Sequence, residues 1–421
     1  MSCKNCKSSK LKKVINIGKQ PISNHFYTKR RINLRKYSLD LYECKNCNLI
    51  QLKEIAKLNE MYGLNYGYRT SLSPLMIEHM KKKVLDIYSQ NLLKKNSNIL
   101  DIGSNDGTFL NFLSKNKNLN LYGIDPSAKK FKKFYNSKIN LIVDYFNKNK
   151  ILNKINKKIK FTLITSFAMF YDIEDPNKFC NEINYLLEKN GKWILELSYF
   201  PLLLENLTYD QICHEHVAYY TLNTFKKIVE KNNLKILDFN FNNINGGSIE
   251  IICSKKKSQY VPKKKKISSQ IEIEKKINNK NYAKFNERVD NVKKILIEFL
   301  KNNKNKIIGY GASTKGNIVL NHCGIDSKKL RYICDANPFK YNRFTPGSNI
   351  KIISKQKMRK MKTKMLLVLI WSFRKEVIKQ ELKFIKEGGK LLFHLPMFHI
   401  IDKNNYKHFI NSNFESFSYK V

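Results

Sequence analysis

The sequence lacks any long apolar run. Its longest uninterrupted apolar stretch, Met365–Trp371, has seven residues, which suits a buried strand and is far shorter than the roughly 20 residues of a membrane-spanning helix. The first ten residues, MSCKNCKSSK, have no apolar stretch behind their charges, so we expect no signal peptide. These absences predict a soluble, cytoplasmic protein without a membrane partner.

Acidic residues are also scarce. Asp and Glu number 34 against 79 Lys and Arg, a formal net charge of +45. Such an excess can indicate a nucleic-acid partner. Here, however, the lysines are spread along the chain among Asn and Ile, as in KNNKNK. We interpret the charge as a compositional bias and expect no nucleic-acid partner, although the surface would suit an anionic substrate. No sequence feature predicts an oligomeric state.

The nine cysteines do not indicate a disulfide framework, because their number is odd and no secretory signal precedes them. Four of them form two Cys-x-x-Cys pairs, Cys3 with Cys6 and Cys44 with Cys47. Four thiolates suit tetrahedral Zn(II) and leave no position for water, so the pattern predicts a structural zinc site. A redox Cys-x-x-Cys is the alternative, but it would need only one pair.

The pattern of apolar and charged residues divides the chain into four parts. Residues 1–55 form the predicted zinc-binding domain, and residues 56–253 alternate strand-like with helix-like runs, as α/β proteins with a parallel sheet do. Residues 254–281 are rich in Lys and are expected to form a solvated connector. Residues 282–421 open with an amphipathic helical pattern and continue as a second α/β, Rossmann-like unit.

The segment NILDIGSNDGTFLNFL is typical of a strand, a turn and a helix. Its glycines are spaced D-x-G-x-x-x-G, where a dinucleotide-binding turn would read G-x-G-x-x-G. The next strand ends on Asp125, which is placed to bind ribose hydroxyls. A wider, polar loop suits a methionyl group and a sulfonium, so we predict S-adenosylmethionine as the cofactor. The predicted cofactor residues are Asp101, Gly103, Ser104, Asn105, Gly107, Asp125, Pro126, Asp144, Tyr145, Ser166 and Ala168.

The segment YDQICHEHVAYYTL concentrates titratable side chains, among them Cys213, His214, Glu215 and His216. Such a density seldom serves packing. One histidine can act as a general base that its neighbours orient. The alternatives are a structural, hydrogen-bonded histidine pair and a two-histidine metal site. We favour the general base.

Together these features resemble the nucleotide-sugar C-methyltransferases that build branched deoxysugars, and the resemblance covers nearly the whole chain. It rests on the two cysteine pairs and on the segments PISNHFY, NYGYRTSLS, DIGSNDG, FAMFYDIEDP, CHEHVAYY, NGGS and GYGASTKGN. The combination is more specific than any one segment.

The resemblance implies a zinc-binding domain, a class I methyltransferase domain with a Rossmann-like sheet, and a C-terminal α/β domain. It further implies that a nucleotide diphosphate 4-keto-6-deoxy sugar is methylated on carbon, with His216 as the base and Glu215 as its partner. Tyr68, or alternatively Tyr66, matches an active-site tyrosine. Some members carry a tyrosine where this chain has Cys213, so a role for that position is open. Either a tyrosine hydroxyl or His214 would donate to the enolate oxygen.

The C-terminal unit contains Gly309-x-Gly311 before Lys315. NAD binding is one interpretation of this turn. We favour contact of its amides and Lys315 with an anionic part of the substrate. Asn245, Gly246 and Arg374 are expected near the same cleft. The alternatives to the sugar methyltransferase are a methyltransferase of another acceptor such as RNA, a nicotinamide dehydrogenase, and a non-catalytic binding protein.

Overall fold

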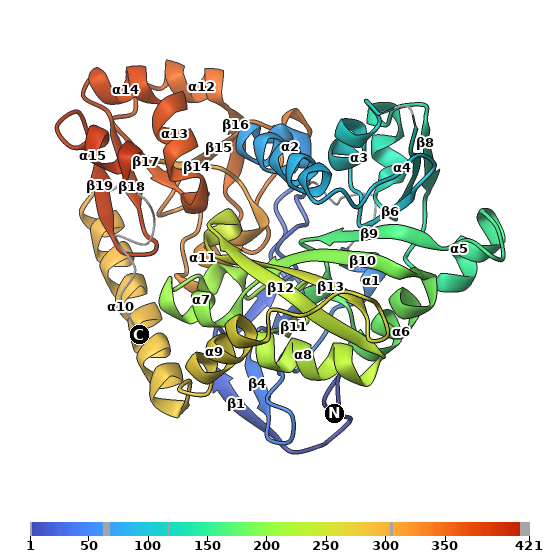
Figure 1. The fold of residues 1–421 in the computed structure, drawn as a ribbon. Helices are drawn as coiled ribbons and strands as arrows, with labels where there is room; N and C mark the ends of the chain where they lie inside the picture. Colours follow the sequence, from blue (N-terminus) through green and yellow to red (C-terminus); the bar gives the residue numbers. More distant parts are fainter. Residues whose placement is uncertain (1, 62–67, 117, 304–305, 413–421) are drawn as a thin grey trace.

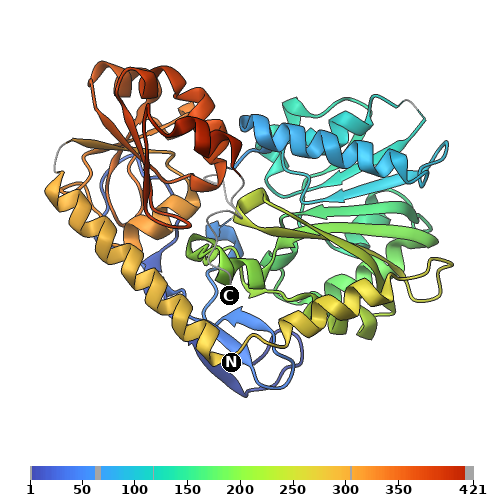
Figure 2. The same cartoon turned by 60° about the vertical axis from the view of Figure 1, so that its left-hand side comes forward.

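The computed structural model describes residues 2–61, 68–116, 118–303 and 306–412. Two α/β units lie side by side, and the N-terminal segment lies beneath both of them, as the blue ribbon in Figure 1 and the turned view in Figure 2 show. The predicted α/β fold is confirmed. No helix of the described residues is long and apolar enough to cross a bilayer.

A four-stranded sheet holds the N-terminal part, in the order β1-β4-β5-β11. Its first three strands are β1 (Leu11–Ile15), β4 (Leu41–Cys44) and β5 (Ile50–Leu52). The fourth, β11 (Ala218–Tyr219), comes from the histidine-rich segment and pairs with β5. A separate pair, β2 (Lys19–Pro21) and β3 (Lys36–Ser38), is antiparallel, and the short helix α1 (Leu58–Met61) follows β5. The strand that ends at Cys44 and the strand that follows the predicted base therefore lie in one sheet.

The central unit is a seven-stranded sheet in the order β12-β13-β10-β9-β6-β7-β8. The five strands from β10 to β8 in this order are parallel, and β13 and β12 are antiparallel. The strands are β6 (Asn98–Ile102), β7 (Asn120–Ile124), β8 (Ile139–Ile142), β9 (Phe161–Phe167), β10 (Leu187–Ser198), β12 (Leu234–Asn242) and β13 (Ser248–Lys255).

Helices cover both faces of this sheet because its strands bury side chains on both sides. Ile99, Leu163 and Ile194 belong to the core beneath α2 and α3, whereas Leu100, Ile164 and Leu195 belong to the core beneath α6 and α8. The helices are α2 (Pro74–Ser89), α3 (Thr108–Leu113), α4 (Ala128–Phe131), α5 (Lys148–Lys154), α6 (Pro176–Leu186), α7 (Phe200–Glu205) and α8 (Leu222–Lys231).

The Lys-rich connector is more ordered than its composition indicates. It contains α9 (Lys264–Glu274), whose Ile267 and Ile271, four residues apart, pack on the core of the central unit. Glu274 is buried and accepts hydrogen bonds from the backbone N–H groups of Leu222 (2.6 Å) and Asn223 (2.8 Å) at the start of α8. Composition alone predicts a loop here, because it does not reveal this buried cap, whose partners lie about 50 residues earlier in the chain.

The long helix α10 (Asn279–Asn302) leads into a six-stranded sheet in the order β16-β15-β14-β17-β18-β19. All neighbouring strands are parallel except β18 and β19. Its strands are β14 (Ile307–Tyr310), β15 (Tyr332–Asp335), β16 (Lys351–Ser354), β17 (Met365–Val368), β18 (Lys390–Phe393) and β19 (His399–Ile401). Its helices are α11 (Thr314–His322), α12 (Lys355–Lys360), α13 (Arg374–Gln380), α14 (Leu382–Lys386) and α15 (Tyr406–Asn411).

Candidate active site

A cavity of about 430 Å³, here called the central cavity, opens at the carboxyl edge of the seven-stranded sheet. Its size is in the range of small-molecule sites. Carboxyl ends of parallel strands meet at this edge, which is where α/β proteins bind ligands. The predicted cofactor residues that line it are Asp101, Gly103, Ser104, Asn105, Asp125, Pro126, Tyr145 and Ala168.

Two buried carboxyls stand on neighbouring strands of this edge. Asp101 accepts a hydrogen bond from the Thr165 hydroxyl (2.7 Å), and burial raises the pKa of Asp101 to about 7. Asp125 accepts from the backbone N–H of Asn105 (2.9 Å) and from the N–H and hydroxyl of Ser127 (2.6 Å each). These bonds fix both carboxyls against the cavity wall, where they suit a ligand with a positive end and ribose hydroxyls.

Three predicted cofactor residues do not line the cavity. Asp144 is paired with Lys150 (2.5 Å), and the Ser166 hydroxyl accepts from the indole N–H of Trp193 (2.9 Å). Gly107 directly precedes α3 with φ +75°, and a Cβ there would lie 2.8 Å from the Tyr135 ring. Its role is therefore conformational, because only glycine combines this φ with such a close ring.

The cavity also has lining that the sequence analysis missed. Met76 and Met80 of α2, Glu196 of β10, and the aromatic residues Phe146 and Phe179 also line it. Glu196 is the only charged residue of the strand stretch WILELS. An isolated acidic residue in an apolar strand is the sequence signal that could have identified Glu196 as a functional residue.

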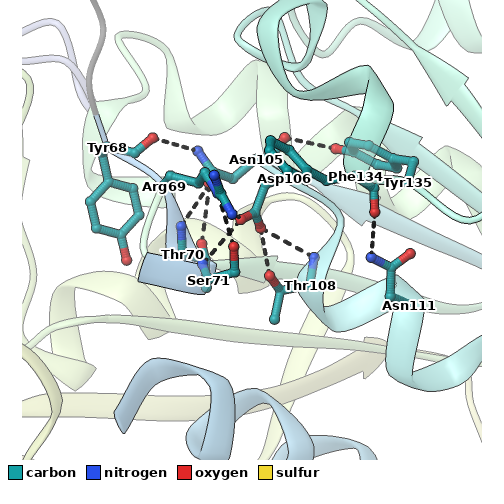
Figure 3. A network of polar contacts seen from close by, with 10 residues as sticks. All are labelled: Tyr68, Arg69, Thr70, Ser71, Asn105, Asp106, Thr108, Asn111, Phe134 and Tyr135. Carbon is teal, nitrogen blue, oxygen red and sulfur yellow. Dashed lines mark hydrogen bonds and ion pairs between the residues drawn. The ribbon is translucent and has the colours of Figure 1, made fainter. Parts of the chain in front are cut away.

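Residues Tyr68–Ser73, here called the strap, cross the loop between β6 and α3, which contains Asn105 and Asp106 (Figure 3). The Asn105 side-chain oxygen accepts from the backbone N–H (3.0 Å) and hydroxyl (3.2 Å) of Thr70, and its amide donates to the Tyr68 carbonyl (3.3 Å). We predicted that Asn105 contacts the cofactor, and its side chain is hydrogen-bonded to the strap.

A second set of bonds fixes the strap through the next loop residue. The Asp106 carboxylate accepts from the Ser71 N–H (3.0 Å) and from the Arg69 guanidinium (3.3 Å). The guanidinium lies 3.8 Å from the centre of the Phe134 ring, a cation–π contact. Tyr68 is 47% exposed, and Tyr66 lies outside the described residues.

A second cavity of about 210 Å³ lies at the carboxyl edge of β14 and β15. Tyr68 and Arg69 of the strap line it, together with Lys340 and Lys355 of the C-terminal unit. The Lys340 ammonium donates to the Ala312 carbonyl (2.9 Å). Tyr68 lines both cavities, so the strap is a shared wall between them.

His216 lies directly behind the wall of the central cavity. Its ring centre is 4.0 Å from that of Tyr171, and the adjacent Val217 donates its N–H to the Tyr171 carbonyl (2.9 Å). Asp172, the next residue, lines the central cavity. His216 itself lines neither cavity and is buried.

The predicted bond between Glu215 and His216 is absent. Among the described residues, Nδ1 of His216 and Oε2 of Glu215 have no hydrogen-bond partner. Burial, assisted by the charge of Lys315, lowers the pKa of His216 to about 3. The ring is neutral rather than poised near pH 7, because the site is desolvated and a cation is nearby.

His214 has a different environment. Its Nε2 lies 3.1 Å from the Gln20 carbonyl and its Nδ1 lies 3.4 Å from the Ser23 hydroxyl. Both ring nitrogens are engaged with the N-terminal segment, which favours a structural role over donation to a substrate.

The remaining predicted substrate residues line neither cavity. Lys315 donates to the Asn245 side-chain oxygen (2.9 Å), and a Cβ on Gly246 would lie 2.6 Å from the Trp371 ring. These residues form a contact between the central and C-terminal units. Arg374 is buried 5.3 Å from the centre of the Phe409 ring, so it packs α13 against α15.

The four predicted zinc ligands converge. The Sγ atoms of Cys3 and Cys47 are 3.5 Å apart, as are those of Cys6 and Cys44, and all four lie within 4.8 Å of one another. Four sulfurs at these separations fit one tetrahedral Zn(II).

Three family models match consecutive parts of the chain. They describe a zinc binding domain (residues 3–62), a methyltransferase domain (residues 76–238) and a C-methyltransferase C-terminal domain (residues 243–396). The C-methyltransferase NovU of Streptomyces niveus is 25% identical over 366 residues, which are 86% of this chain and 86% of NovU.

The two solved structures described next each cover less than half of this chain. The plantazolicin methyltransferase BpumL, in complex with a pentazolic desmethylPZN analog and SAH, is 14% identical with a TM-score of 0.35 and covers 44% of this chain and 86% of its own. An S-adenosylmethionine-dependent methyltransferase of Clostridium acetobutylicum is 15% identical with a TM-score of 0.32 and covers 42% of this chain and 91% of its own. Similarity of this extent says nothing about the acceptor.

Proposed function

We propose that this chain, an S-adenosylmethionine-dependent methyltransferase with the three-domain organisation of C-methyltransferases, methylates a carbon of a nucleotide diphosphate 4-keto-6-deoxy sugar. The observation that carries this proposal is the pair of cavities that share Tyr68. One is built for a cofactor, and the other is lined by Arg69, Lys340 and Lys355, which suit a diphosphate.

The residues present fit the cofactor. Asp125 would bind its ribose hydroxyls, and the aromatic lining at Tyr145, Phe146 and Phe179 would enclose its adenine. When bound, the cofactor supplies an electrophilic methyl group. The chain's own residues must then bring the acceptor carbon to it and remove a proton from that carbon.

A carbon beside a ketone loses a proton because the remaining electron pair moves onto the oxygen. His216 is the proposed base, since its Nδ1 has no partner among the described residues and can accept that proton. The C–H pair becomes the enolate and then the new C–C bond, while the S–C pair stays on sulfur. The negative charge of the enolate offsets the low pKa of the imidazole by stabilising the imidazolium.

Tyr68 is the proposed donor to the enolate oxygen. The ordinary pKa of a tyrosine is 10, so the phenol keeps its proton at neutral pH and can donate it in a hydrogen bond. Its position on the shared wall fits a substrate that spans both cavities.

Mass spectrometry of the protein incubated with S-adenosylmethionine and a panel of nucleotide 4-keto-6-deoxy sugars tests the proposal. We expect one sugar to gain a methyl group, and deuterium from solvent to enter the adjacent carbon even without the cofactor. His216→Asn should abolish both reactions yet leave cofactor affinity within about twofold, because His216 does not line the cofactor cavity. Exchange and turnover near the parent rate in this variant would exclude His216 as the base.

A further inference from the structure

We propose that Glu196 recognises the positive charge of the cofactor's sulfonium and thereby makes the site distinguish the methyl donor from its uncharged product. The inference rests on the cofactor alone and is independent of the sugar substrate.

The position of Glu196 follows from the register of three strands. On β9, Thr165 pairs with Asp101 of β6, and Phe167 pairs with Glu196 of β10. Residues two apart on a strand share a face. Asp101 and Glu196 therefore point to the same face of the sheet, with Asp101 one strand and Glu196 three strands away from the strand that ends before Asp125.

The lining of the central cavity orients the ligand along this row. Tyr145 and Phe146 follow β8, and the Phe179 ring lies 4.8 Å from that of Phe146, whereas Glu196 is on β10 at the other end of the row of parallel strands. Adenine suits the aromatic end, and Asp125 between the two suits the ribose. The part of the cofactor beyond the ribose, which carries the sulfonium, then extends towards Glu196.

Glu196 is held as an anion by a buried network. Its carboxylate binds Nε2 of His79 (3.0 Å), the Lys83 ammonium (2.9 Å) and the Asn242 side-chain amide (2.8 Å). Burial alone would raise its pKa, but the His79 hydrogen bond and the Lys83 charge lower it to about 2. The carboxylate therefore stays ionised across the physiological range.

Lys83 alone does not cancel the negative charge of this network. Lys83 also binds Glu250, so one lysine serves two carboxylates. One ammonium offsets only one of these two carboxylates, and the side chain of Glu196 is 3% exposed. A buried charge acts over several ångströms with little screening.

A sulfonium has no N–H or O–H to donate, so a protein recognises it by charge. When the methyl group leaves, the S–C electron pair remains on sulfur and the positive charge disappears. The attraction of Glu196 then ends, which favours exchange of the product for a new donor. Asp101 is a weaker candidate for this role, because its pKa of about 7 leaves it partly protonated at neutral pH.

Calorimetric titration without acceptor tests this inference. The ligands are S-adenosylmethionine, sinefungin (which carries an ammonium in place of the sulfonium) and S-adenosylhomocysteine (which is neutral there). In Glu196→Gln, we expect affinity for both charged ligands to fall on the order of 10-fold to 100-fold, and affinity for S-adenosylhomocysteine to change less than threefold. Glu196→Asp, which keeps the charge, should lose much less.

Glu250→Gln is the matched control. It removes a carboxylate from the same lysine, but Glu250 does not line the central cavity. We expect its charged-to-neutral affinity ratio to stay within threefold of the parent. Equal losses for all three ligands in Glu196→Gln, no loss for any, or the same selective loss in Glu250→Gln would each overturn the inference. Failure of sugar methylation would leave it intact, because no acceptor is present.

Discussion

Asp101 combines a buried carboxyl with a single side-chain hydrogen bond, from Thr165. Its folded pKa of about 7 lies above the ordinary value of 3.8. The stability that its proton contributes is complete below pH 4 and is lost as the pH rises through 7. Asp101→Asn should therefore stabilise the cofactor-free protein at pH 8 by roughly 1–4 kcal/mol, since an amide can accept the same bond without a charge.

Chemical denaturation at several pH values measures this effect. The gain of Asp101→Asn over the parent should grow between pH 4 and 7 and stay constant above. Asp290→Asn, an exposed position on α10, serves as the surface control. The same substitution should weaken S-adenosylmethionine binding, because the carboxylate no longer faces a cationic ligand. A gain that is equal at pH 5 and pH 8 contradicts the assigned pKa.

At the residue level, the sequence placed side chains at the cavity where a local pattern fixes the geometry. Asp101, Gly103 and Asp125 follow from one strand, one turn and the next strand, and all line the cavity. Sequence reasoning failed where the partner is distant in sequence. The carboxylate of Glu196 is held by a hydrogen bond with His79, which is 117 residues away in the sequence. No local spacing encodes that contact.

At the level of elements, the zinc knuckles and the proposed base are joined by a pair of strands. β5 starts three residues after Cys47, and it pairs with β11, which starts two residues after His216. The Leu52 N–H also donates to the Val217 carbonyl (3.0 Å). Loss of the metal should loosen β5 and move His216 without reaching the cofactor cavity.

Cys44→Ser tests this connection. We expect the bound zinc, measured by mass spectrometry or a chromogenic chelator, to fall from one per chain to none. Methyl transfer should drop at least tenfold, whereas cofactor affinity should stay within threefold. Cys180→Ser, a buried cysteine outside the cluster, is the control and should keep its zinc. Parallel losses of activity and cofactor affinity would indicate general unfolding instead.

Helix α12 contributes Lys355 to the second cavity, and its neighbour Lys357 is exposed outside it. If the cavity binds a diphosphate, Lys355→Ala should raise the KM of the sugar nucleotide about tenfold and leave cofactor affinity unchanged. Lys357→Ala removes the same charge from the same helix and should change neither. Equal effects of both substitutions would mean that only the overall charge matters.

Helices and strands were predictable where apolar residues recur at regular spacing, as in the strands and in α10. The connector was not, because two isoleucines and a buried cap hold α9 among lysines. The pairing of β11 with β5 was equally hidden, since two residues of strand carry no periodicity.

On the scale of the whole molecule, the strap joins both cavities and both α/β units. Asn105 and Asp106 hold it on one side, and the Ser73 hydroxyl donates to Glu376 of α13 (3.1 Å) on the other. A ligand that binds in one cavity and orders the strap therefore also orders the residues of the strap that line the other cavity. Binding at the two cavities should therefore be coupled, and the coupling must be reciprocal.

Titration with S-adenosylhomocysteine and thymidine diphosphate measures this coupling. Saturation with either ligand should tighten the other by roughly 5-fold to 10-fold, and by the same factor in both directions. Asp106→Asn removes the charge that pairs with Arg69, so its coupling factor should approach one while each ligand alone still binds. The strap then acts as the connection between cofactor and substrate. A parent protein whose two affinities are independent would show instead that the shared wall is rigid and that Tyr68 serves each cavity separately.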